Sequence, residues 1–198
     1  DEQKATGVIT ASAGNHAQGV AISAQKLGIR ATIVMGQNTP SIKVNAVRDR
    51  GAKVVLHGDN YDEASQHAKA LCQAQALVYI PPYDDVDVIA GQGTIGMEIV
   101  NQHSQPLDAI FVPVGGGGLV AGVAAYVKYV RPNTKIIGVE AQGSNCLDVA
   151  MKAGRRVRLP IDQLDLFADG VSVAQIGKET FKVAKKYVDD VVVVNVDE

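Results

Sequence analysis

Two stretches of small residues each join a strand-like run to a helix-like run, and both carry groups suited to binding an anion. In the first, "GVITASAGNHAQG", Ser12, Asn15 and His16 stand at the expected helix start. Backbone N–H groups at such a position, together with the Ser12 hydroxyl, can receive a carboxylate. The Asn15 amide can hydrogen-bond an aromatic hydroxyl or its oxyanion. His16 has a second interpretation, because its ring can simply pack or cap at the helix start.

The second stretch, "FVPVGGGGLVAGVAAYV", places four consecutive glycines between a strand and the helix expected from Leu119 to about Tyr129. Each glycine in ordered structure costs up to about 1 kcal/mol relative to alanine. Successive N–H groups without Cβ atoms can converge on a phosphate, and charge-assisted hydrogen bonds contribute roughly 1.5–3 kcal/mol each. The glycines therefore favour a phosphate site over the alternative, a closely packed turn.

Two kinds of phosphorylated cofactor fit this turn. The spacing Gly116-x-Gly118-x-x-Ala121 satisfies a dinucleotide fingerprint, and Glu140 stands where a ribose-binding acid would end the next strand. A nicotinamide-dependent oxidoreductase is therefore one hypothesis. A carboxylate pocket facing a phosphate pocket across a cleft describes instead an amino acid bound to a phosphorylated cofactor. Pyridoxal phosphate is such a cofactor, and the first stretch favours it.

The elements that must position these turns alternate between strands and helices. Apolar and β-branched runs predict strands, and helical spacing fills the gaps between them, which indicates parallel sheets with crossover helices. Gly28 should end the first helix, Thr39 should cap the second with Pro40 in its first turn, and Asn60 with Glu63 should form a capping box. The expected strands are Val8–Thr10, Ala31–Met35, Lys53–Leu56, Leu77–Ile80, Ala109–Val114, Lys135–Val139 and Val191–Val194.

The segment "YIPPYDDVDV" interrupts this alternation around Pro81–Asp87, so a first α/β unit is expected before it and a second after it. The 198 residues include 19 basic and 21 acidic side chains without a basic stripe, which argues against nucleic acid as a partner. The uncharged run from Ala109 to Val127 contains Pro113 and the four glycines, so it does not indicate a membrane span.

The cysteines and the remaining histidines lack the spacing of a metal site. Cys72 and Cys146 form no CxxC pair, so neither a zinc site nor a disulfide framework is predicted. The other histidines are most simply surface residues, namely His57, His67 and His103. No metal is therefore expected.

Five motifs in order carry a resemblance over essentially the whole chain: "ASAGNHAQG", "IPPYDD", "GQGT", "PVGGGGL" and "FADGVSV". Together they resemble the biosynthetic threonine dehydratases (threonine ammonia-lyases), which are fold-type II pyridoxal-phosphate enzymes. The resemblance implies two three-layer αβα units with parallel sheets, as in the β subunit of tryptophan synthase. Residues 1–80 would form the small unit with the substrate loop, and residues 81–198 part of the large cofactor-binding unit.

The resemblance also implies roles for particular residues. Asn15 would bind the ring hydroxyl of pyridoxal 5'-phosphate, and Gly170 would line its pyridine ring. The loop that receives the substrate carboxylate would comprise Ser12, Asn15 and His16. The cofactor phosphate would be held by Gly115, Gly116, Gly117, Gly118 and Leu119.

Four differences from members of this family lead to further expectations. The Schiff-base lysine, in a Ser-x-Lys segment of the family, is expected upstream of Asp1, and the serine partner of the pyridine nitrogen beyond Glu198, so both ends look cut. Racemase relatives place a metal-binding acid where this chain has Cys146, so no such metal site is expected. They also carry a serine at the position that matches Ala13.

The implied activity is dehydration and deamination of L-threonine to 2-oxobutanoate and ammonia, in isoleucine biosynthesis, with L-serine as a further substrate. The expected partners are a small amino acid and further copies of the chain in a homo-oligomer, with no nucleic acid and no membrane. The expected location is the cytoplasm, or the plastid in a plant. The alternatives are the nicotinamide-dependent oxidoreductase and a non-catalytic, cofactor-free fragment.

Overall fold

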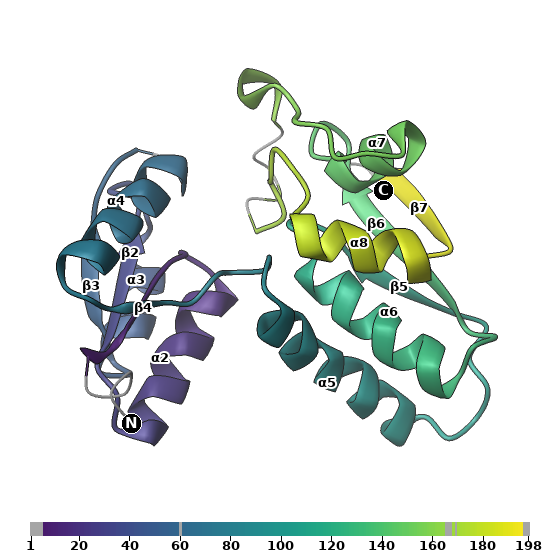
Figure 1. Cartoon of the computed structure of the whole chain (residues 1–198), viewed down its shortest axis with the longest axis horizontal. Helices are drawn as coiled ribbons and strands as arrows, with labels where there is room; N and C mark the ends of the chain where they lie inside the picture. The colour runs from purple at the N-terminus through teal and green to yellow at the C-terminus, as the bar shows by residue number, and fades with distance from the viewer. Residues whose placement is uncertain (1–5, 60, 165–167, 169, 196–198) are drawn as a thin grey trace. The chain divides into compact units, whose positions relative to one another are not determined.

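The structure, a computed structural model, describes residues 6–59, 61–164, 168 and 170–195. The chain divides into two compact units, Asp1–Pro82 and Tyr83–Glu198 (Figure 1). Among the described residues, no helix combines the length and apolar character needed to cross a bilayer.

The first unit alternates strands and helices along the chain. Its sheet has the order β3-β2-β1-β4, and every neighbouring pair is parallel. Its elements are β1 (Val8–Ala11), α2 (Asn15–Leu27), β2 (Ala31–Met35), α3 (Ser41–Arg48), β3 (Lys53–Leu56), α4 (Tyr61–Ala74) and β4 (Val78–Tyr79).

Apolar side chains fill both faces of this sheet, as a central parallel strand requires. On one face Ala17, Ala21 and Ala24 of α2 pack with Ile33 and Met35 of β2. On the other face, Ala64 and Ala68 of α4 pack against Ile9, Ala11 and Val34. The small alanines let both helices lie close to the strands. Because α2 and α4 cover opposite faces of the sheet, the first unit has three layers.

The helix ends of the first unit confirm one capping prediction and correct another. Gly28 ends α2 in the left-handed conformation with φ +66°, as predicted. Thr39 was the wrong cap for α3: the helix begins at Ser41, the Pro40 carbonyl accepts its first hydrogen bonds, and the N-cap is therefore Pro40, without a side-chain cap. Asn60 lies outside the described residues, and Glu63 accepts a hydrogen bond from the N–H of Asp59 at 2.9 Å.

The second unit has a parallel sheet of order β5-β6-β7. All the predicted strands of the chain are confirmed to within two residues at each end. The elements of this unit are α5 (Val86–Gln102), β5 (Ala109–Pro113), α6 (Gly118–Val130), β6 (Lys135–Ala141), α7 (Cys146–Ala153), the 3-10 turn η1 (Ile161–Gln163), α8 (Lys178–Tyr187) and β7 (Asp190–Val194).

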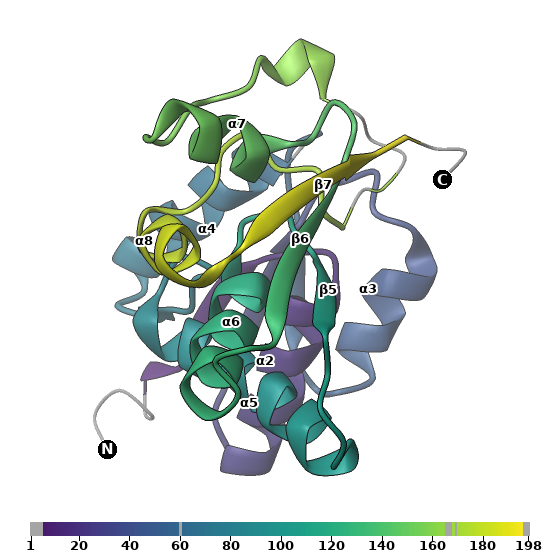
Figure 2. The same ribbon diagram turned by 90° about the vertical axis from the view of Figure 1, so that its right-hand side faces the viewer.

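Helices α6, α7 and α8 bury one face of this sheet (Figure 2). Strand residues that point to that face, such as Val112 and Ile136, join Val120, Leu147 and Phe181 in one apolar core. Strand alternation sends Phe111 and Val192 to the opposite face, where they are exposed. The parallel sheets and the α/β class agree with the sequence prediction.

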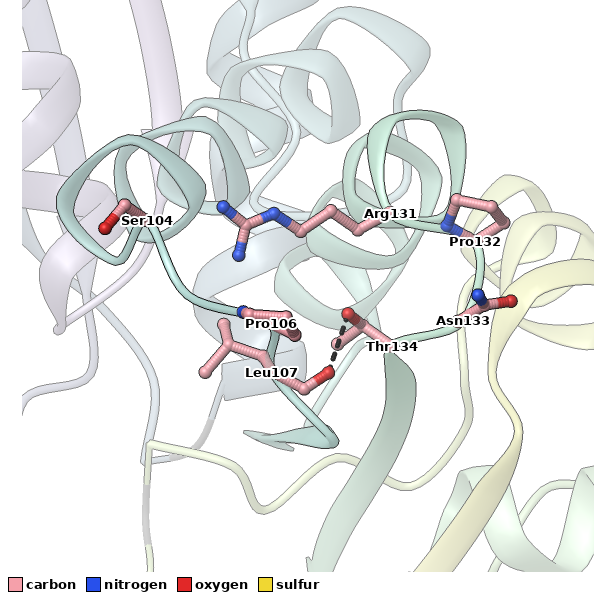
Figure 3. Close-up of a pocket in the computed structure, with 7 residues that line it drawn as sticks. All are labelled: Ser104, Pro106, Leu107, Arg131, Pro132, Asn133 and Thr134. Carbon is pink, nitrogen blue, oxygen red and sulfur yellow. Dashed lines mark hydrogen bonds between the residues drawn. The ribbon is translucent and has the colours of Figure 1, made fainter.

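Helix α5 is anchored at both ends. The Asp85 carboxylate accepts from the N–H groups of Asp87 and Val88 at 2.9 and 3.2 Å, a side-chain N-cap. At the other end, the Arg131 guanidinium donates to the carbonyls of Val100, in the last turn of α5, and of His103, which follows it. Figure 3 shows this guanidinium directed toward Ser104, in the segment after α5. These contacts fix α5 alongside α6.

Candidate cofactor-binding site

The four glycines connect the carboxyl end of β5 to the start of α6. Gly117 is the N-cap of α6 and adopts φ +91°, a left-handed conformation that favours glycine. Gly116, Gly117 and Gly118 are buried. The turn therefore holds backbone, with no side chains, at the end of the sheet where α/β folds bind ligands.

Other parts of the second unit press closely against this turn. A Cβ on Gly115 would stand 3.0 Å from the Val171 Cα, and one on Gly117 would stand 2.5 Å from the Ile176 Cδ1. A Cβ on Gly116 would overlap the ring of Tyr83. The close-packing alternative thus explains why side chains are missing, but it does not explain the N–H groups on the same turn.

Those N–H groups are the main chemical feature of the turn. None of the backbone N–H groups of Gly115–Leu119 donates to an acceptor in the described part of the chain. Buried N–H groups without an acceptor are costly and rare in folded proteins. At a helix start they also carry the positive end of the helix dipole, so a bound phosphate would satisfy both. The residues present therefore fit a phosphate.

The close approaches bring several of the sequence motifs to one place in the second unit. Tyr83 comes from "IPPYDD" and Val171 from "FADGVSV", and both lie against the glycine turn. Gly170, the predicted ring-lining residue, is the exposed neighbour of Val171. The Ser172 hydroxyl is buried and has no hydrogen-bond partner among the described residues. Sequence reasoning missed Tyr83, since only the fold brings it to the turn.

The loop after β1 in the first unit has a similar supply of unpaired N–H groups. Ser12 Oγ accepts from the Gly14 N–H at 3.2 Å, which closes a tight turn. The N–H groups of Ala13, Asn15 and His16 have no acceptor in the described part of the chain. Asn15 is exposed at the first position of α2. This loop can therefore receive an anion through its backbone.

The His16 ring is turned into the first unit. Its Nε2 lies 3.0 Å from Thr10 Oγ1 and 3.3 Å from the carbonyl oxygen of Ile80. Burial lowers the pKa of this imidazole, although the contact with Ile80 acts in the opposite direction. The ring thus holds the loop to the strand ends, and the group that His16 offers to a ligand is its backbone N–H.

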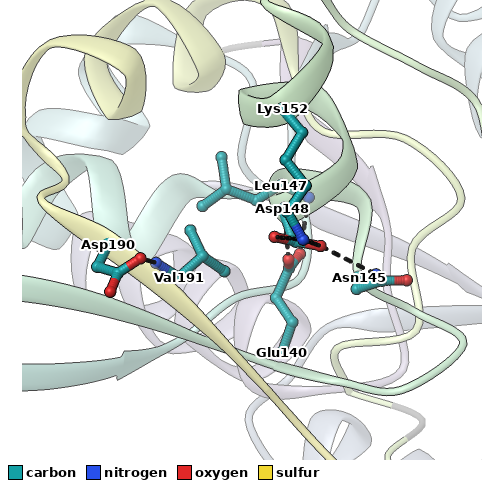
Figure 4. A network of polar contacts seen from close by, with 7 residues as sticks. All are labelled: Glu140, Asn145, Leu147, Asp148, Lys152, Asp190 and Val191. Carbon is teal, nitrogen blue, oxygen red and sulfur yellow. Dashed lines mark hydrogen bonds and ion pairs between the residues drawn. The ribbon is translucent and has the colours of Figure 1, made fainter.

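Glu140 caps helix α7 from the end of β6 (Figure 4). Its two carboxylate oxygens accept from the N–H groups of Leu147 and Asp148, both at 2.8 Å, and the side chain is 1% exposed. Asp148 in turn pairs with Lys152 at 2.8 Å. Glu140 is therefore unavailable to a ribose hydroxyl, so the nicotinamide hypothesis was wrong about this residue.

Burial of Glu140 has a consequence for stability against pH. Burial raises the pKa of this carboxyl from 4.5 to about 7, although the two N–H donors act in the opposite direction. The folded chain then holds the proton more tightly than the unfolded chain, so the Glu140 contribution falls as pH rises from about 4.5 to about 7. The shift corresponds to about 3 kcal/mol.

We expect the Glu140→Gln variant to lack this part of the pH dependence. Urea unfolding of both proteins at pH 5 and pH 7.5 measures it: over this range the free energy of unfolding should fall by about 2 kcal/mol more in the parent than in the variant. Parallel pH profiles would show that Glu140 stays ionised throughout this range.

A surface depression in the second unit lies far from the glycine turn. This depression, of about 300 Å³, lies beside Arg131, between Ser104 and Thr134, at the opposite end of α6 (Figure 3). The guanidinium there already donates a hydrogen bond to the Gln105 carbonyl at 2.9 Å.

In the first unit, the rings of His57 and His67 stack with centroids 3.8 Å apart, a pairing that their spacing in the sequence did not reveal.

Comparison with known proteins agrees with this geometry. The whole chain, residues 1–198, matches the model of the family described as pyridoxal-phosphate dependent enzyme. It is 59% identical to the biosynthetic L-threonine dehydratase of Pasteurella multocida, over 100% of this chain and 38% of that protein. It is 57% identical to the chloroplastic biosynthetic threonine dehydratase of Arabidopsis thaliana, over 99% of this chain and 33% of that protein.

Solved structures show the same fold. The processed form of threonine deaminase isoform 2 from Solanum lycopersicum aligns with a TM-score of 0.93 and 52% identity, over 98% of this chain and 56% of that one. Serine racemase from Dictyostelium discoideum aligns with a TM-score of 0.88 and 31% identity, over 100% of this chain and 62% of that one. The chain thus spans less than two thirds of each of these proteins. With its glycine turn and fold-type II architecture, it belongs to the family of pyridoxal-phosphate dependent enzymes.

Proposed function

We propose that the glycine turn holds the phosphate of pyridoxal 5'-phosphate. The observation that carries this proposal is the set of N–H groups of Gly115–Leu119, which have no acceptor among the described residues although the glycines between them are largely buried. When bound, this cofactor supplies an electron sink for the Cα carbanion of an amino acid. The chain's own part is to bind the phosphate through backbone N–H groups and to orient the ring.

The same proposal assigns the remaining binding residues. Asn15 hydrogen-bonds the cofactor's ring hydroxyl, and Gly170 lines the ring. Ser12, Asn15 and His16 receive the substrate carboxylate, which is consistent with the unpaired N–H groups of that loop. In this scheme residues 1–80 are the small unit and residues 81–198 are part of the large one.

We propose that the reaction is dehydration and deamination of L-threonine to 2-oxobutanoate and ammonia, the entry to isoleucine biosynthesis. The names of the two dehydratases described above support this choice. L-Serine is a second substrate, because one methyl group is worth only about 1–3 kcal/mol of discrimination. We further propose that the protein is a homo-oligomer and that it lies in the cytoplasm, or in the plastid of a plant.

The test uses the protein expressed from its whole gene. Titration of the protein with pyridoxal phosphate should show saturable binding by absorbance, and the loaded protein should then convert added L-threonine to a keto acid and ammonia. A reduced nicotinamide dinucleotide should not bind, as judged by its fluorescence. Binding without turnover would contradict the reaction, and binding of neither cofactor would favour the cofactor-free alternative.

Ala13 is expected to influence whether the substrate undergoes elimination or racemisation. Its methyl group packs half-buried against the apolar core of the first unit, and a methyl group can neither give nor take a proton. A positioned proton donor is worth about 10²–10⁴-fold in general acid catalysis. Ala13→Ser should therefore raise D-serine formation from L-serine, relative to elimination, by about tenfold or more.

Chiral chromatography of the product alongside keto-acid release measures this ratio. Ala13→Gly is the matched control, because it changes the size of the side chain without adding a hydroxyl. If the parent already racemises as fast as it eliminates, Ala13 does not discriminate between the two reactions.

A further inference from the structure

Two neighbouring carboxylates in the segment after Pro82 bind two different helix starts. Asp85 caps α5, whereas Asp84 reaches α8, almost a hundred residues further along the chain. Asp84 Oδ2 accepts from the Lys178 N–H at 2.8 Å, and Oδ1 accepts from the N–H of Glu179 at 2.7 Å and of Thr180 at 3.3 Å. The first turn of α8 is therefore held by a side chain from a distant segment.

That first turn in turn holds the glycine loop. The hydroxyl of Thr180, which is fully buried, donates to the Gly116 carbonyl at 2.8 Å. The N–H of Gly177 donates to the same carbonyl at 3.2 Å. A Cβ on Gly177 would stand 2.5 Å from Asp84 Oδ1, so the carboxylate lies directly against this residue. Asp84, Gly177, Thr180 and Gly116 thus form one connected set.

The direction of the Gly116 carbonyl sets the direction of the next N–H group. In a trans peptide, the C=O of Gly116 and the N–H of Gly117 point to opposite sides of the C–N bond. Because the carbonyl faces α8, the Gly117 N–H faces away from α8, and it has no acceptor among the described residues. It is one of the N–H groups assigned above to the phosphate.

We propose that Asp84 is a positioning residue for the phosphate-binding turn, a role that rests on the proposed function. Its carboxylate fixes the first turn of α8, Thr180 and Gly177 fix the Gly116 carbonyl, and the Gly117 N–H is thereby aimed at the phosphate. An ionised carboxylate suits this task, because both oxygens accept and the negative charge lies at a helix N-terminus. An asparagine offers one acceptor oxygen and would turn its NH₂ donors toward a backbone N–H.

The test compares Asp84→Asn with Asp85→Asn in the protein expressed from its whole gene. Both changes remove one charge from a helix cap, but only Asp84 connects to the glycine turn. The readout is the dissociation constant of pyridoxal phosphate, titrated into the apoprotein, with urea unfolding measured in parallel. Asp84→Asn should raise the dissociation constant about tenfold, the loss of one charge-assisted bond, and Asp85→Asn less than about twofold.

A second pair of variants tests the link between α8 and the turn. Thr180→Val removes the hydroxyl that binds the Gly116 carbonyl, and Thr180→Ser keeps it. The valine variant should bind the cofactor about tenfold more weakly, and the serine variant should restore affinity to near the parent value. This pair decides the matter if Asp84→Asn does not fold.

Equal affinities in the parent and Asp84→Asn, or equal losses in the two aspartate variants, would overturn the role of Asp84. So would equal affinities in the two Thr180 variants. These results differ from failure of the proposed function, in which the parent itself would bind no pyridoxal phosphate.

Discussion

The Gly117→Val variant is expected to bind pyridoxal phosphate at least about 100-fold more weakly than the parent, the loss of two charge-assisted N–H bonds. Valine is strained at the φ of +91° that Gly117 adopts. Its Cβ would also stand 2.5 Å from Ile176 Cδ1 and 3.0 Å from Thr180 Oγ1. The turn must therefore move, and its N–H groups lose their common direction. Titration of the apoprotein with the cofactor measures the change.

Gly154→Val is the matched control for backbone strain. Gly154 also has a left-handed conformation, with φ +66°, but a Cβ there would meet nothing within 4 Å. That variant should lose stability and keep the affinity of the parent for pyridoxal phosphate. Unchanged affinity in Gly117→Val would instead contradict the assignment of the phosphate to this turn.

Gly122→Val should lower the free energy of unfolding by about 3 kcal/mol or more, the upper end of what overpacking costs. A Cβ on Gly122 would stand 2.6 Å from the Gly93 nitrogen and would overlap the carbonyl of Ile89, both backbone atoms of α5. Backbone cannot rotate aside as a flexible side chain can, so α5 and α6 must separate. Urea unfolding of the variant and its parent measures the loss.

The control lies on the same helix pair. Gly91 of α5 is exposed and a Cβ there would meet nothing within 4 Å, so Gly91→Val should change stability by less than about 0.5 kcal/mol. Similar losses in the Gly91 and Gly122 variants would show that close packing at Gly122 does not decide the result.

Local pattern was enough to predict the elements that surround the site. The run Ala31–Met35 coincides with β2, because a parallel strand buried on both faces leaves a continuous apolar run. The run Lys53–Leu56 coincides with the edge strand β3, where the β-branched pair Val54 and Val55 favours a strand. Gly28 marked the end of α2 for an equally local reason, its left-handed conformation. The glycine quartet likewise revealed the turn between β5 and α6, since a strand and a helix flank it in the sequence.

Contacts between distant segments could not be predicted in this way. Asp84 belongs to an acidic cluster that the sequence marked only as an interruption, yet its carboxylate caps α8. Glu140 stood at the position of a ribose-binding acid, and only the structure shows that α7 folds back onto its oxygens. Thr39 failed for a different reason: the first hydrogen bonds of α3 go to the Pro40 carbonyl, so the helix starts one residue later than the Thr-Pro pair indicated.

The strand order of the first unit also constrains when the chain can fold during its synthesis. Strand β1 lies inside the sheet, between β2 and β4. Its partner β4 comes much later in the chain, so that Val8 pairs with Val78. A ribosome adds about 5–20 residues per second, so roughly 4–14 seconds separate the synthesis of these two partners. During that interval the β4-facing edge of β1 is open to pairing with any other strand. The nascent chain is therefore most exposed to misassembly before Val78 and Tyr79 have left the ribosome.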